Sequence, residues 1–155
     1  MKYVNYSVVF QEIPDEVSLA INISNCPNNC VECHSAYLKD NIGLLLDKTA
    51  IDKLMNKYKK DVTCFCFMGG DAEPDMVCEL SKYIKDNFEG IKTAWYSGKE
   101  EIYDKYKNGT FDYIKVGPYL KGFGPLNEKT TNQRLYKING DAKEDITYKF
   151  WKHGK

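Results

Sequence analysis

The chain has 155 residues, of which 43% are hydrophobic and 28% charged, and these values are typical of one globular domain with its own core. We therefore expect a single domain over residues 1–155. The 22 basic and 22 acidic side chains cancel, so neither a nucleic acid nor an anionic membrane is expected as a partner. No apolar run approaches the ~20 residues of a membrane span, and the first residues lack the apolar core of a signal peptide. These features predict a cytoplasmic protein, and in that compartment clustered cysteines more often bind metal or do redox chemistry than form disulfides.

Two strands are predicted before the first cysteines. Residues 3–10 form the first of them. From residue 17 to residue 23, apolar side chains alternate with small or polar ones, which is typical of a half-buried strand. We expect the two strands to lie side by side, and the second to run directly into the stretch NCPNNCVECH at residues 25–34.

Helices and strands are predicted to alternate in the middle of the chain. Apolar residues at helical spacing indicate a first amphipathic helix; they are Ile51, Leu54, Met55 and Tyr58. Thr49 and Asp52 have the spacing of a capping box at its start. Residues 62–68 predict a buried strand that ends in Gly69-Gly70-Asp71, and Pro74 suits the first position of a second helix.

The last part of the chain predicts two more strands and a hairpin. The strands cover residues 91–96 and 111–116, with a short helix around Ile102, Tyr103 and Tyr106 between them. Residues 120–134 have no clear period and predict a long loop. The tail resembles a hairpin, with a turn near Asn139-Gly140 and a second strand through Ile146, Tyr148 and Phe150.

This order of elements predicts an α/β fold with a mostly parallel, curved sheet, an N-terminal strand and a C-terminal hairpin. A closed eight-stranded barrel needs at least ~200 residues, so we expect a partial β/α barrel. Parallel α/β sheets bind ligands at the carboxyl ends of their strands. The features that follow the four parallel strands should therefore meet at one rim: the cysteine stretch, Gly69-Gly70-Asp71, Ser97-Gly98 and Gly117-Pro118-Tyr119.

Cys26, Cys30 and Cys33 are spaced C-x3-C-x2-C, and His34 follows directly. They could form a disulfide, hold zinc together with His34, or hold a four-iron cluster. Zinc sites usually combine two spaced ligand pairs, and adjacent residues such as Cys33 and His34 rarely face one ion. Three thiolates on a four-iron cluster leave one iron without a protein ligand, which favours chemistry at that iron. The remaining cysteines have the pattern of small buried core residues; they are Cys64, Cys66 and Cys78.

The C-x3-C-x2-C spacing, followed one strand later by Gly69-Gly70-Asp71, resembles the radical S-adenosylmethionine (SAM) enzymes. Within that superfamily the chain is most similar to the activating proteins of anaerobic ribonucleotide reductase. The resemblance covers nearly the whole chain and includes FMGGD, WYSG, a strand ending in Gly-Pro-aromatic, and Thr131 to Arg134 (TNQR) before a final strand.

The resemblance implies that Cys26, Cys30 and Cys33 bind a [4Fe–4S] cluster, with no catalytic residues beyond these ligands. SAM would chelate the fourth iron through its amino and carboxylate groups. Gly69, Gly70 and Asp71 would meet its amino end, and the backbone of Glu32, Cys33 and His34 would lie along its adenine. Ser97 and Gly117 would approach the ribose or adenine.

The resemblance also implies the reaction and its partners. A reduced flavodoxin or ferredoxin would supply one electron, and the C–S bond of SAM would break to give a 5′-deoxyadenosyl radical. That radical would take a hydrogen from a glycine Cα of the reductase and so store a glycyl radical there. Two positions depart from the usual pattern: Glu32 replaces an aromatic residue before the third cysteine, and Asp71 stands where glutamate is more common. A radical SAM enzyme for a small molecule or peptide and a non-catalytic zinc-binding module remain the alternatives.

Overall fold

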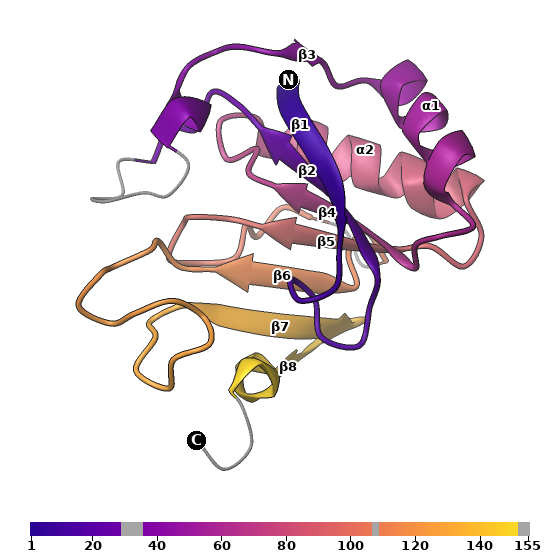
Figure 1. Ribbon diagram of the computed structural model, residues 1–155. Helices are drawn as coiled ribbons and strands as arrows, with labels where there is room; N and C mark the ends of the chain where they lie inside the picture. The colour runs from indigo at the N-terminus through magenta and orange to yellow at the C-terminus, as the bar shows by residue number, and fades with distance from the viewer. Residues whose placement is uncertain (29–35, 107–108, 152–155) are drawn as a thin grey trace.

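The computed structural model describes residues 1–28, 36–106 and 109–151, and it has an α/β fold built on one mixed eight-stranded sheet (Figure 1). The strands are β1 (Lys2–Val9), β2 (Ser18–Ile23), β3 (Leu44–Leu45), β4 (Cys64–Met68), β5 (Lys92–Tyr96), β6 (Tyr113–Val116), β7 (Arg134–Asn139) and β8 (Ala142–Asp145). The helices are α1 (Lys48–Tyr58) and α2 (Pro74–Asn87), with short 3-10 helices η1 (Ala36–Lys39) and η2 (Thr147–Phe150). None of the helices in these ranges is both long enough and apolar enough to span a membrane.

The strand order is β3-β1-β2-β4-β5-β6-β7-β8. The four central strands β2, β4, β5 and β6 are parallel, whereas β1, β3, β7 and β8 pair antiparallel with their neighbours. The sheet is therefore mixed, and the expectation of a mostly parallel sheet is wrong outside its centre. Short connections allow only antiparallel pairing, and β7 and β8 are joined by two residues. The N-terminal strand and the C-terminal hairpin are confirmed, and over the described residues the sheet does not close into a barrel.

Both α-helices cover the same face of the sheet (Figure 1). Their apolar stripes pack on large strand residues such as Phe65, Phe67 and Trp95, and this layer is the main core. The other face carries smaller residues, including Ala20, and is covered by Ile13 and Ile146 from outside the sheet. Strand β2 is buried on both faces as a result, so the prediction that it is half-buried is wrong.

The two predicted α-helices are confirmed, but the first is capped differently from the prediction. The Asp47 side chain accepts a hydrogen bond from Ala50 N at 2.9 Å and is the N-cap of α1, so the capping box at Thr49 is wrong. Pro74 occupies the first turn of α2, as the sequence predicts.

Two predictions for the second half of the chain are wrong. Residues 101–106 form turns instead of a short helix, although Ile102, Tyr103 and Tyr106 still pack on the main core. In the tail, β8 begins at Ala142, directly after the tight turn, and Thr147–Phe150 is a 3-10 helix. Pairing starts at once because a two-residue hairpin connection fixes the register of both strands.

Candidate functional site

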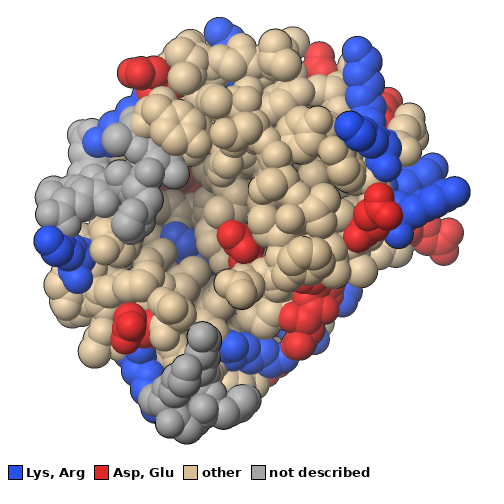
Figure 2. Space-filling model, viewed as in Figure 1, with Lys and Arg blue, Asp and Glu red and all other residues tan. Residues whose placement is uncertain are grey.

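The carboxyl ends of β2, β4, β5 and β6 lie together at one rim, on the left of the molecule in Figure 1. A cavity of about 210 Å3 opens there between the strand ends and the segments that follow them. Figure 2 shows the hollow on this face, with few charged side chains around it. Of the predicted site residues, the lining includes Cys26, Gly69, Asp71, Ser97 and Gly117. The structure thus brings the four strand ends into one cavity.

The Asp71 carboxylate is the centre of the hydrogen bonds in this cavity. Ser97 Oγ donates to its Oδ1 at 2.6 Å, and Gly98 N donates to its Oδ2 at 2.8 Å. Asn28 Nδ2 donates to the same Oδ2 at 2.7 Å. Asp71 therefore joins the end of β4 to the end of β5 and to the residues that follow β2. A carboxylate offers about four acceptor positions, and the contacts among the described residues leave one of them, on Oδ1, to meet a ligand.

The two glycines before Asp71 have different surroundings. Gly69 lines the cavity, and its carbonyl accepts a hydrogen bond from Trp95 Nε1 at 2.9 Å. Gly70 has φ +99°, and a Cβ built on it would stand 2.4 Å from Val77 Cγ2 of α2. Gly70 therefore permits the close approach of the turn to α2, whereas Gly69 is the glycine that can approach a ligand.

Cys26 is partly exposed and borders the cavity at the start of the cysteine stretch. Its backbone N donates to Leu38 O at 2.9 Å, and the preceding Asn25 N donates to Asp40 O at 2.9 Å. These two bonds tie the segment before the cysteines to η1 and the residue after it. The backbone position of Cys26 is thus fixed by hydrogen bonds to this neighbouring segment.

Cys30 and Cys33 lie outside the described residues, as do Glu32 and His34. The predicted ligand set can therefore be followed in the structure only at Cys26. Across residues 1–28, 36–106 and 109–151, no group of three or more histidine, cysteine or acidic side chains is close enough to hold a metal ion.

Lys115 brings a buried cation to the same cavity. Its ammonium donates to Ser97 O at 3.1 Å and to Gly117 O at 3.0 Å, and it lies 5.4 Å from the centre of the Tyr96 ring. It therefore joins the ends of β5 and β6. A cation held by carbonyls and an aromatic face at a cavity wall favours anionic groups in that cavity.

The segment Thr131 to Arg134 forms part of the opposite wall. Gln133 lines the cavity, and a Cβ on Gly117 would stand 3.0 Å from Gln133 Cα. Asn132 Nδ2 donates to Pro118 O at 3.0 Å. This stretch thus packs directly against the Gly-Pro-aromatic turn that follows β6.

Of the other described cysteines, Cys64 and Cys66 are buried in the core, and Cys78 is partly buried against it. Burial raises the pKa of Cys64 to about 12 and the pKa of Cys66 well above its ordinary value. Burial also raises the pKa of Cys78 to about 11. All three thiols are protonated at neutral pH, which agrees with their prediction as core residues because the thiolate is the nucleophile and metal ligand.

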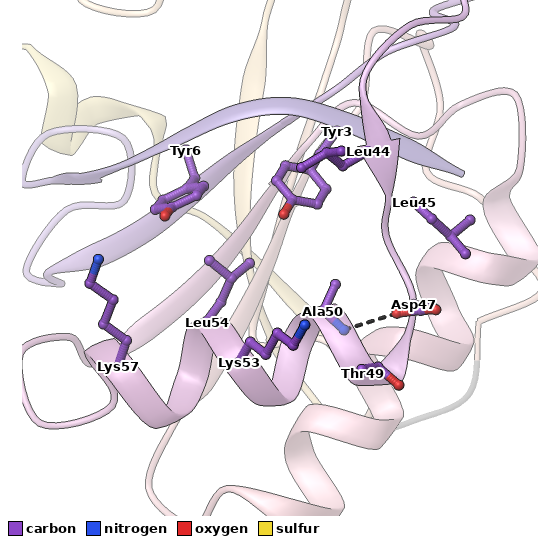
Figure 3. Close-up of a pocket in the computed structure, with 10 residues that line it drawn as sticks. All are labelled: Tyr3, Tyr6, Leu44, Leu45, Asp47, Thr49, Ala50, Lys53, Leu54 and Lys57. Carbon is purple, nitrogen blue, oxygen red and sulfur yellow. Dashed lines mark hydrogen bonds between the residues drawn. The ribbon is translucent and has the colours of Figure 1, made fainter.

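A larger cavity, of about 480 Å3, lies between β1 and α1 (Figure 3). Tyr3 and Tyr6 of β1 point toward Leu54 of α1, and Lys53 and Lys57 lie along its open side. None of the predicted site residues that the structure describes lines this groove. Its size does not make it the stronger candidate, because it brings together no thiol and no cluster of hydrogen-bonded strand ends.

Two residues of the site were missed by sequence reasoning. The sequence assigns no role to Asn28 or Lys115, although both line the cavity. A lysine inside the buried strand β6 is an unusual residue type for that position, and this is the signal that could have revealed Lys115. Comparisons with protein-family models, with curated proteins and with solved structures gave no significant match.

Proposed function

We propose that this protein is a radical SAM activase that generates a glycyl radical on an anaerobic ribonucleotide reductase. The observation that carries the proposal is the cavity in which Cys26 and the Asp71 carboxylate meet at the carboxyl ends of parallel strands. Cys26 is the first cysteine of the C-x3-C-x2-C spacing, and Asp71 belongs to the Gly-Gly-Asp turn. The presence of these two residues at one cavity supports a shared ligand.

The described residues fit a cluster with SAM beside it. A thiol at the edge of the cavity is the donor that iron–sulfur clusters require, and Cys30 and Cys33 would complete the set. Asp71 has an acceptor position for an ammonium group, and Lys115 is a cation suited to a carboxylate. The backbone at Gly69 offers polar groups without a side chain in the way. We assign Ser97 and Gly117 to the walls, and Glu32, Cys33 and His34 to the adenine side.

The cluster, when bound, supplies the electron for reductive cleavage of SAM. The work of the chain's own residues is to bind and orient the substrate. Asp71 would accept from the amino group, and Lys115 would hold the charge of the carboxylate. Ser97 would keep the Asp71 carboxylate in place, because its hydroxyl already donates to Oδ1.

The sheet itself supports the proposal of a partial β/α barrel. The four parallel strands β2, β4, β5 and β6 carry α1 and α2 on one face, and the cavity opens at their carboxyl ends. We propose that this rim admits a loop of the partner protein.

The test begins with anaerobic reconstitution with iron and sulfide, followed by dithionite and SAM. We expect a brown protein with four irons per chain that produces 5′-deoxyadenosine. A colourless protein that retains zinc and leaves SAM intact would favour the zinc-binding module instead. An intact four-iron cluster that does not cleave SAM would rule out both radical SAM functions.

The second step separates the two radical SAM functions. The glycyl-radical subunit of an anaerobic ribonucleotide reductase is added with SAM and a reduced flavodoxin or ferredoxin, and the sample is examined by EPR. A glycyl radical that depends on both proteins supports the activase. Cleavage of SAM without any radical on the reductase would point to a different peptide or small-molecule substrate.

A further inference from the structure

The Asn28 side chain connects the two halves of the candidate site. Its amide nitrogen lies 2.7 Å from Asp71 Oδ2 and 3.6 Å from Cys26 Sγ, so one NH2 group reaches both the carboxylate and the thiol. An amide has two N–H donors and can serve both acceptors at once. Asn28 also lies within the cysteine stretch, two residues after Cys26 and two before Cys30.

The absence of a side chain at Gly98 makes room for this contact. A Cβ built on Gly98 would stand 2.7 Å from Asn28 Nδ2 and 3.6 Å from Asp71 Oδ2. The first of these distances is too short for a real contact, so any larger residue would push the amide away. Gly98 N also donates to Asp71 Oδ2 at 2.8 Å. The same residue therefore helps to hold the carboxylate and leaves space for its amide partner.

The residues on either side of Asn28 are held independently of it. Asp71 is fixed by Ser97 and Gly98, and Cys26 is fixed through its backbone bond to Leu38. Among the side-chain hydrogen bonds of the described residues, those of the Asn28 amide join Cys26 to Asp71. Loss of the amide would thus free the two parts to move relative to each other without unfolding either.

We propose that Asn28 is a positioning residue that holds the Cys26 thiol at a fixed place relative to the Asp71 carboxylate. Its effect on a bound cluster rests on the proposed function. A hydrogen bond to a ligating sulfur withdraws electron density and makes the cluster easier to reduce. The bond to Asp71 keeps that sulfur next to the place where the amino group of SAM would bind.

The first test uses the metal-free full chain and does not depend on any cluster. Alkylation of Cys26 by iodoacetamide is followed at one pH by peptide fragmentation, which separates Cys26 from Cys30 and Cys33. We expect Asn28→Ala and Gly98→Ala each to slow alkylation of Cys26 by about twofold to fourfold, because the lost N–H stabilises the nucleophilic thiolate and the higher basicity of the remaining thiolate offsets this only in part. The buried Cys64 in the same sample reports on the fold and should stay unmodified.

Two further variants separate positioning from packing. Asn28→Asp keeps the size of the side chain but removes the donor and places a second carboxylate beside the thiol, which disfavours the thiolate, so its alkylation rate should be the lowest. Asn22→Ala removes another amide of the cavity, one that donates to Asn5 Oδ1 at 2.6 Å, and should leave the rate at Cys26 unchanged. Equal rates in wild type, Asn28→Ala and Asn28→Asp would overturn the proposal.

The second test measures the midpoint potential of the reconstituted protein by EPR-monitored titration. We expect Asn28→Ala to have a lower potential than the wild type, and Asn22→Ala to match the wild type. An unchanged potential in Asn28→Ala would overturn the proposed bond to the cluster sulfur.

The two tests distinguish failure of this inference from failure of the proposed function. If the Asn28 variants alter Cys26 alkylation but no variant and no wild-type sample binds a cluster, the positioning role stands and the radical SAM function fails. If the wild type binds a cluster and cleaves SAM while the Asn28 variants match it in both measurements, the function stands and the positioning role fails.

Discussion

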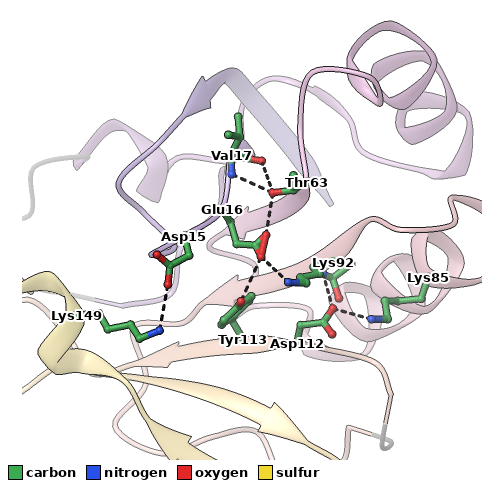
Figure 4. A network of polar contacts seen from close by, with 10 residues as sticks. Asp15, Glu16, Val17, Thr63, Lys85, Lys92, Asp112, Tyr113 and Lys149 are labelled. Atoms are coloured by element: carbon green, nitrogen blue, oxygen red, sulfur yellow. Dashed lines mark hydrogen bonds and ion pairs between the residues drawn. The ribbon is translucent and has the colours of Figure 1, made fainter.

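At each end of the parallel strands a carboxylate accepts hydrogen bonds from several segments, and the two carboxylates differ in their partners. At the carboxyl ends, Asp71 bonds to groups that follow the strands, among them Asn28 beside a cysteine. At the amino ends, Glu16 bonds to residues at the starts of β4, β5 and β6 (Figure 4). The same type of side chain therefore serves a candidate site at one end and the sheet alone at the other.

The Glu16 carboxylate bonds to three side chains at the strand starts, and we call these contacts the Glu16 network. The Glu16 side chain is only 5% exposed; Oε1 pairs with Lys92 Nζ at 2.6 Å, and Oε2 accepts from Thr63 Oγ1 at 2.8 Å. Tyr113 OH donates to Oε1 at 3.4 Å. The nearby Asp112 pairs with Lys85 at 2.6 Å and accepts from Thr93 N. Each of these carboxylates pairs with a lysine, so the network stabilises the strand starts.

The comparison teaches that hydrogen bonding alone does not identify a functional carboxylate. Asp71 differs from Glu16 in its surroundings: glycine-rich backbone, a cavity and a thiol reached through one amide. Variants at the two ends should therefore have different effects: those at the Asp71 end should change the chemistry, and those at the Glu16 end should change the stability.

The largest expected effect is on the cysteine stretch. Cys30→Ala removes one of three predicted cluster ligands, so reconstitution should fail and production of 5′-deoxyadenosine should fall to background. Iron analysis and product chromatography measure the two quantities. The matched control is Cys64→Ala, whose thiol lies in the core and should keep both iron binding and cleavage. Full activity in Cys30→Ala would remove Cys30 from the ligand set.

The next effect is on stability at the amino ends. Glu16→Gln should lower the free energy of unfolding by about 2–3 kcal/mol, because it breaks a largely buried charged hydrogen bond and leaves Lys92 without its partner. Urea denaturation measures the change. Asp15→Ala is the control, since the Asp15 carboxylate is 76% exposed in its pair with Lys149 and should contribute at most about 1 kcal/mol. Equal losses in the two variants would contradict the structural role of the Glu16 network.

A smaller loss is expected at the turn before Asp71. Gly70→Ala should cost about 1–2 kcal/mol, because the new Cβ meets Val77 Cγ2 at a backbone angle that favours glycine. Gly90→Ala has a similar positive φ but no atom within 4 Å of the new Cβ, so it measures the backbone strain alone. The difference in unfolding free energy between the two variants is the cost of the clash. No difference would mean that the turn shifts freely away from α2.

The smallest effect is a pH dependence from the core thiols. Burial raises the pKa of Cys64 from 9.0 to about 12, so the folded protein prefers the protonated thiol. This contribution to stability is fully present below about pH 9 and is lost as the pH rises toward 12. Cys64→Ala should cost about 1 kcal/mol at neutral pH by loss of packing, and its stability should then fall less steeply than that of the wild type between pH 9 and 12. Parallel curves would contradict the burial of this thiol.

The fold was predictable where a local pattern determines an element. The stripes of α1 and α2 gave the correct elements because burial on one side of a helix repeats at a fixed period, and the short apolar runs of β4 and β5 gave the correct elements because these strands are buried on both faces. The prediction of a short helix in residues 101–106 was wrong because turns can also bury tyrosines. Tyr103 packs on Trp95, and Tyr106 packs on Phe111. The sequence predicted too few antiparallel strands. The connections decide the direction of a strand, whereas its apolar period is the same in either direction.

The site was predictable as a set of strand ends and not as a set of contacts. Parallel strands bring their carboxyl ends to one rim in any such sheet, so Gly69, Asp71 and Ser97 were expected to meet. The pairing of Asn28 with Asp71 spans 43 positions in the chain, and that of Glu16 with Lys92 spans 76. No local pattern encodes contacts between residues so far apart, and the residue types alone do not distinguish them from solvated polar groups.

The central claim is that the carboxyl-end rim carries the chemistry, and the most direct test is the yield of 5′-deoxyadenosine per reconstituted cluster in Asp71→Asn and Glu16→Gln. We expect Asp71→Asn to lose most of this yield while its unfolding free energy changes little. Glu16→Gln should be less stable and keep the wild-type yield per cluster under conditions where it is folded. A wild-type yield in Asp71→Asn, with a loss of cleavage in folded Glu16→Gln, would contradict the account.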